Sequence, residues 1–137
     1  MIEAKIDFSS LEKELERIEK YANSGKPEKI AARVTKASIY ERSSRGVDAD
    51  GVRYKPYSPA YAKQRAKEGL RVSPPNLIRK DVMLKSMHLK SDRTMSVSNE
   101  ERAKAEGNVK YGRQPFGVSA TDAKVIAKDI AKDLSDN

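Results

Sequence analysis

Residues 48–61, DADGVRYKPYSPAY, place a turn, an extended segment and the start of a helix in quick succession. Asp50-Gly51 is typical of a turn, because glycine adopts positive φ angles and aspartate bonds the local backbone. Pro56 pushes the residue before it into an extended conformation. Ser58-Pro59 then predicts a helix start, with Ser58 as the N-cap and proline at a position that needs no N–H. The segment predicts a fixed scaffold and does not resemble an active site.

Helical periodicity precedes this segment. Ser9 and Glu12 have the spacing of a capping box. An apolar stripe then follows at helical intervals on a highly charged helix, and it consists of Leu11, Leu15, Ile18 and Ala22. Gly25 is expected to end this helix in a left-handed conformation, and Pro27 to open a second helix. Residues 1–45 therefore predict a helical hairpin.

The remainder of the chain contains shorter elements and one long helix. A short basic helix is expected after Pro59 and ends at Gly69, while the prolines within residues 70–76 exclude a helix there. A turn and short helix are expected over 77–87, a β-hairpin over 87–98, and a short strand over 109–111. Ser119 and the residue three positions later form a second capping box, which predicts an amphipathic helix over 119–134.

These elements together predict one α+β domain over residues 1–137. Its parts are the helical hairpin of residues 1–45, a mixed segment over 46–118 with a small antiparallel sheet, and the C-terminal helix of residues 119–134. Hydrophobic residues make up 37% of the chain and charged residues 35%. A small core is expected, so a partner surface could complete the burial, which is a first indication of an oligomer.

The net charge of +8 is concentrated in the middle of the chain. Residues 53–93 contain eleven basic and three acidic residues, whereas the segments on either side are balanced. Such a basic region indicates a polyanion or an acidic neighbouring subunit as a partner, or else a solvated surface. The candidates for facing a partner or DNA are Arg53, Lys55, Lys63, Arg65, Lys67, Arg71, Arg79 and Lys80.

Tyrosines alternate with these basic residues at positions 54, 57 and 61. Aromatic rings interleaved with cations can stack on bases and neutralise phosphates. The rings can instead pack in a core or an interface while the cations point outward. The rigid prolines of the segment favour packing.

Residue types that carry catalytic and metal chemistry are scarce. The chain has no cysteine and one histidine, which excludes cysteine nucleophiles and disfavours a zinc site. His88 has no legible nucleophile or carboxylate beside it, so a structural or surface role is favoured over general-base catalysis. Asp48 and Asp50 lack the later ligands of a calcium loop. We therefore expect no enzyme activity, no cofactor and no metal; the alternative of an enzyme from a small unrecognised class depends on His88 alone. The absence of a signal-like or membrane-length apolar run indicates a soluble intracellular protein without a membrane partner.

Three separated segments form an ordered pattern. The first contains Asp50, Gly51, Tyr54, Pro56, Ser58 and Tyr61, the second Leu84 and Ser86, and the third Gly107, Arg113, Phe116, Gly117 and Ser119. In this order they resemble the virion morphogenesis family of tailed bacteriophages, the small tail completion and head–tail joining proteins. Tyr54 stands where that family usually has tryptophan, and residues 80–83 replace its Thr-Gly pair.

The resemblance implies a non-enzymatic structural protein of a tailed phage or prophage, acting in tail completion or head–tail joining as a ring-type oligomer at the neck or tail end. The implied partners are further copies of the chain, other phage neck, tail or head proteins, and packaged DNA in non-specific contact. The implied location is the bacterial host cytoplasm during assembly and then the virion. Tyr54 is implied to be buried or at an interface, and Gly107 to lie in a loop. The alternative is a sequence-nonspecific nucleic-acid-binding protein that uses residues 53–93.

Overall fold

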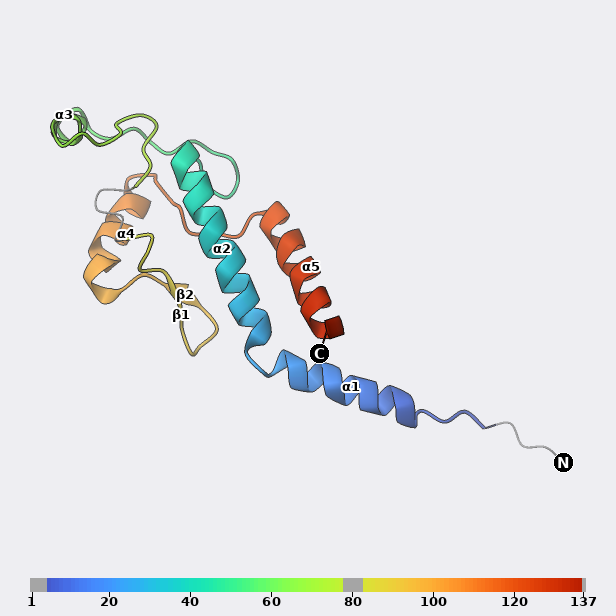
Figure 1. Ribbon diagram of the computed structural model, residues 1–137. Helices are drawn as coiled ribbons and strands as arrows, with labels where there is room; N and C mark the ends of the chain where they lie inside the picture. The colour runs from blue at the N-terminus through green and yellow to red at the C-terminus, as the bar shows by residue number, and fades with distance from the viewer. Residues whose placement is uncertain (1–4, 78–82, 137) are drawn as a thin grey trace.

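The computed structural model describes residues 5–77 and 83–136, and their fold is α+β, as the sequence predicts. Within these residues, five α-helices accompany one 3-10 helix and one two-stranded antiparallel sheet (Figure 1). In chain order the elements are α1 (Ser9–Ala22), α2 (Lys26–Arg45), α3 (Pro59–Lys67), β1 (His88–Leu89), β2 (Met95–Ser96), η1 (Asn99–Glu101), α4 (Arg102–Lys110) and α5 (Ala120–Asp136).

Helix α5 packs along α2, and a buried ion pair joins the two (Figure 1). The predicted capping box at the start of α5 is confirmed, because Ser119 Oγ accepts from the Asp122 N–H and an Asp122 oxygen accepts from the Ser119 N–H. Arg42 of α2 donates to that carboxylate at 2.6 Å and to the Gly117 carbonyl at 2.9 Å. Arg42 thus links α2 to the N-terminus of α5 and to the loop that precedes α5.

Helix α1 runs away from α2 in an open arrangement instead of folding against it (Figure 1). Its start differs from the prediction by one residue: Phe8 is the N-cap position, and the Ser9 side chain makes no capping bond. The Asp7 carboxylate instead accepts from the Ser9 N–H at 2.9 Å. Gly25 is left-handed as expected, but it lies directly before α2.

The turn at residues 48–51 forms, with Gly51 left-handed as predicted. The organising carboxylate is Asp48, not Asp50: Asp48 Oδ1 accepts from the N–H groups of residues 50 and 52, both at 2.9 Å. Gly46 is also left-handed, and a Cβ there would lie 2.5 Å from Pro74 Cβ. The close approach of the Pro74 ring therefore requires glycine at this corner, where α2 ends.

The middle of the chain follows the prediction in most respects. Ser58 caps α3, since its Oγ accepts from the Tyr61 N–H at 3.3 Å, and α3 ends before a left-handed Gly69. The β-hairpin pairs His88 with Ser96 and Leu89 with Met95. The strand expected at 109–111 is wrong, because residues 109 and 110 form the last turn of α4. The helix expected over 77–87 falls partly outside the described residues, and residues 83–86 form a turn.

The hydrophobic core lies among α2, the turn after it, the β-hairpin and α4. Its buried members are Ile39, Tyr54, Leu77, Met83, Leu84, Met87, Val97 and Ala105. Tyr54 is 4% exposed, which confirms the expectation that it is buried. Burial raises the pKa of its hydroxyl, which lies 3.2 Å from Ser43 Oγ.

Candidate functional site

The basic candidates divide into exposed and buried side chains. Arg53, Lys55, Lys63 and Lys67 are exposed, in the turn and on α3. Arg71 is exposed as a residue, but its guanidinium donates to the Pro74 carbonyl at 2.9 Å. Arg79 and Lys80 lie outside the described residues. The cations available to a partner are therefore fewer than the sequence count indicates.

The prediction that Arg65 faces DNA or a partner is wrong, because Arg65 is 1% exposed. Its guanidinium carbon lies 4.7 Å from the centre of the Tyr57 ring and 5.8 Å from that of Tyr61. Its nitrogens donate to the Arg71 carbonyl and to Asn76 Oδ1. A guanidinium loses less hydration on burial than an ammonium and stacks on aromatic rings, which explains an interior arginine here. Arg65 joins α3 to the loop that follows it.

The tyrosines of residues 54–61 support the packing interpretation. Tyr57 is buried, and its hydroxyl accepts from the Leu77 N–H at 3.0 Å. Tyr61 is half-buried and meets Tyr57 edge to face at 5.1 Å. Rings held in this way are not available to stack on nucleic-acid bases.

The three segments of the family pattern meet in space although they are far apart in sequence. Tyr54 and Leu84 belong to one core cluster, and Phe116 packs against it. Arg113 donates to the Lys55 and Pro56 carbonyls, both at 3.3 Å, and its guanidinium carbon lies 5.0 Å from the centre of the Tyr57 ring. The first and third segments are thus joined directly, and the second packs beneath them.

The remaining residues of the pattern have structural roles, with one correction. Ser86 Oγ donates to the Met83 carbonyl and accepts from the Ser98 N–H, which joins the turn to the β-hairpin. Asp50 is exposed in its turn. Gly107 was expected in a loop, but it lies inside α4, where a Cβ would meet no atom within 4 Å. The glycine is therefore not required by a turn at this position.

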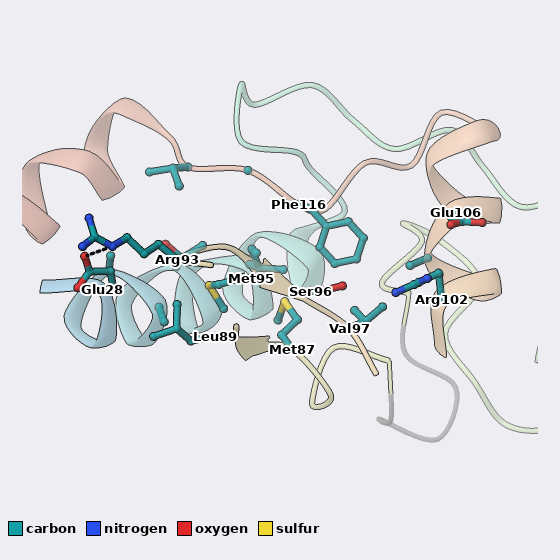
Figure 2. A pocket seen from close by; sticks show the side chains of 17 residues that line it. Glu28, Met87, Leu89, Arg93, Met95, Ser96, Val97, Arg102, Glu106 and Phe116 are labelled. Atoms are coloured by element: carbon teal, nitrogen blue, oxygen red, sulfur yellow. Dashed lines mark ion pairs between the residues drawn. The ribbon is translucent and has the colours of Figure 1, made fainter. Parts of the chain in front are cut away.

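An apolar groove opens beside the β-hairpin and has a volume of about 560 Å³ (Figure 2). Its walls come from α2, the hairpin, α4 and the loop before α5, and its floor contains Ile39, Met87 and Met95. Figure 2 shows Glu28 and Arg93 paired at one end, with Arg102 and Glu106 at the other. The sequence does not indicate this groove, because its walls come from four separate parts of the chain.

A second apolar surface lies on α1 and the residues before it. The stripe predicted from the sequence is present, but most of it is uncovered: Leu11 is 51% exposed, Leu15 54% and Ile18 39%. Ile6 and Phe8 extend the uncovered surface toward the N-terminus. Exposed apolar patches of this kind mark interaction sites in soluble proteins.

No catalytic arrangement is visible around His88 among the described residues. The ring is exposed, and its Nδ1 lies 2.9 Å from the Ser86 carbonyl oxygen. Over residues 5–77 and 83–136 there is no cluster of three or more His, Cys, Asp or Glu side chains that could hold a metal ion. None of the helices in those two ranges is both long and apolar enough to cross a membrane.

Comparison with known proteins adds no relative. No protein-family model, curated protein or solved structure matches this chain.

Proposed function

We propose that the chain is a non-enzymatic structural protein of a tailed phage or prophage. It acts in tail completion or head–tail joining, as a ring-type oligomer at the neck or tail end. It assembles in the bacterial host cytoplasm and remains in the virion, in contact with other neck, tail or head proteins. The resemblance of the three sequence segments supports the choice of family. The exposed surfaces of the chain support the proposed mode of action.

The observation that carries this proposal is the uncovered apolar face of α1. A 14-residue helix with Leu11, Leu15 and Ile18 about half exposed gains little from tertiary packing, although such packing supplies most helix stability. A subunit of an assembly has this property, because its neighbours supply the missing contacts. A protein that works as a monomer has no use for such a face.

The convergence of the three segments supports the family assignment. Tyr54, Leu84 and Phe116 come from the three segments and contribute to one core region. Because these residues pack together, their role is to maintain the fold. Such a role fits a structural protein. In this proposal the exposed cations of the turn and α3 select an acidic partner surface or contact packaged DNA.

Nucleic-acid binding is the competing function, and it would use Arg53, Lys55, Lys63 and Lys67. It is weakened by the burial of Arg65 and by the engaged Tyr57 ring. It predicts affinity that falls steeply with salt, because cations that bind phosphates release counterions.

Light scattering on the purified protein at low and high salt, with and without duplex DNA, separates the two functions. The assembly proposal predicts a discrete oligomer, or a monomer that oligomerises on its target, with weak DNA binding at either salt concentration. A monomer that binds DNA tightly at low salt and releases it at high salt would favour the competing function. Neighbouring capsid, portal and tail genes would support the assembly proposal, whereas metabolic neighbours would contradict it.

A further inference from the structure

Helix α1 is held away from the body of the chain by its contacts with the end of α5. The Tyr21 hydroxyl donates to the Asp133 carboxylate at 2.7 Å, and Arg17 donates to the Leu134 carbonyl at 2.7 Å. Burial and the nearby Asp133 charge raise the pKa of Tyr21 to about 12, so the hydroxyl keeps its proton near neutral pH. Tyr21 itself is buried. The helix is thus fixed at its base and extends away from the body of the chain (Figure 1), with Leu11, Leu15 and Ile18 about half exposed.

The groove beside the β-hairpin has an apolar lining that can accept a helix face. Small residues of α2, Ala31 and Ala32, form part of one wall, and Leu89, Val97 and Phe116 line it elsewhere (Figure 2). An amphipathic helix docks in a groove of this kind by inserting apolar side chains spaced three and four residues apart. Leu11, Leu15 and Ile18 have that spacing.

The uncovered area of α1 and the charge of the chain both favour this contact. Five uncovered apolar side chains between residues 6 and 18 present on the order of 100 Å² each. Their sum of roughly 500 Å² is about the share that one partner contributes to a specific interface of about 1,000 Å². Helix α1 also carries four glutamates and three basic residues in a chain of net charge +8, so the body of a neighbouring copy attracts it.

We propose that α1 of one copy docks its Leu11, Leu15 and Ile18 face in the hairpin groove of a second copy. The inference deepens the proposed function, on which it rests, by naming the two surfaces that join subunits. The donor face and the groove are different surfaces, so the contact is heterologous, and each copy can donate one helix and accept another. Repetition of such a contact closes into a ring when the rotation between copies permits it.

Cysteine cross-linking tests this contact directly, because the chain contains no cysteine of its own. Leu15→Cys and Ala32→Cys are introduced into separate chains, which are mixed and treated with a short bis-maleimide. We expect a cross-linked dimer containing one copy of each variant. Lys13→Cys mixed with Ala32→Cys is the matched control, since Lys13 is exposed on the polar face of α1. Absence of the dimer, or equal yields for the two mixtures, would overturn the inference.

A second pair of variants tests the same contact without a cross-linker. Leu15→Asp places a charge on the docking face, and Lys13→Gln makes the same change in net charge on the polar face. Because both side chains are exposed, we expect both variants to keep the wild-type circular dichroism spectrum. Light scattering should then show Leu15→Asp at the monomer mass of 15.3 kDa and Lys13→Gln as the wild-type oligomer.

The outcomes separate this inference from the proposed function. An oligomer that survives Leu15→Asp overturns the α1 contact but leaves a ring built from other surfaces. A protein that stays monomeric and gives no cross-link also overturns the contact. In that case, the test of the proposed function is whether complete phage particles assemble without the protein.

Discussion

The buried pair between Arg42 and Asp122 should be the most sensitive point of the fold. Their charged atoms lie 2.6 Å apart, and the two side chains are 6% and 9% exposed. Replacement of Asp122 by alanine leaves a buried guanidinium without its counter-charge, which costs about 3–5 kcal/mol. The same change removes the carboxylate that accepts from the Ser119 N–H at the start of α5. A loss of this size is a large part of a typical stability of about 5–15 kcal/mol.

Asp129→Ala is the matched control, because Asp129 is an aspartate of the same helix. It lies 3.8 Å from Arg33, with side chains 39% and 71% exposed, and surface pairs of this kind contribute about 0–1 kcal/mol. Urea unfolding followed by circular dichroism measures both variants. With a slope of about 2 kcal/mol per M, the midpoint for Asp122→Ala should fall by roughly 2 M. If Asp122→Ala unfolds within about 1 kcal/mol of Asp129→Ala, the reasoning about the buried pair is wrong.

Three further predictions concern stability and use the same unfolding assay. Tyr54→Ala should cost about 3–5 kcal/mol because a buried ring is lost, whereas Tyr54→Phe should cost about 1 kcal/mol. Gly46→Ala should cost at least about 1 kcal/mol more than Gly25→Ala, because both glycines are left-handed but only the Gly46 Cβ meets Pro74. Burial opposes ionisation of Asp122, but the hydrogen bonds to its carboxylate outweigh burial and lower its pKa below the ordinary 3.8. The stability that the ionised Asp122 adds is therefore complete above pH 3.8. It is lost as the pH falls through the pKa of the folded state. Asp122→Asn should flatten this acid dependence, and an unchanged slope below about pH 4 would contradict the assignment.

Local chemistry predicted the starts of α3 and α5 and the turn at Gly51, but not the cap of α1. Ser58, Ser119 and Gly51 behave as their neighbours in sequence dictate, because caps and turns depend on residues within three or four positions. The β-hairpin over 87–98 was predicted for the same reason. Gly107 shows the limit, since a glycine in a helix interior costs only about 1 kcal/mol and the surrounding residues keep the helix.

Contacts between distant segments could not be predicted from the sequence. Arg42 and Asp122 are eighty residues apart, and nothing in the charge pattern distinguishes them from surface residues. Arg65 was counted among exposed cations because composition does not reveal which arginine stacks between tyrosines. The groove is invisible for the same reason, since four segments form its walls.

The apolar stripe of α1 was visible in the sequence, but its exposure was not. Leu11, Leu15 and Ile18 fit a helix packed within its own chain equally well. Two contacts from α1 to the end of α5, made by Arg17 and Tyr21, set its direction. Its uncovered face is the basis for the assembly that we propose.

Electron microscopy of particles made without this protein tests the central claim most directly. The proposal requires that the gene lies in a phage or prophage genome. It is deleted there, and the lysate is compared with one complemented by the wild-type chain. The account predicts separated heads and unfinished tails, corrected by the wild-type chain and by Lys13→Gln but not by Leu15→Asp. Complete, infectious particles in the absence of the protein would contradict it.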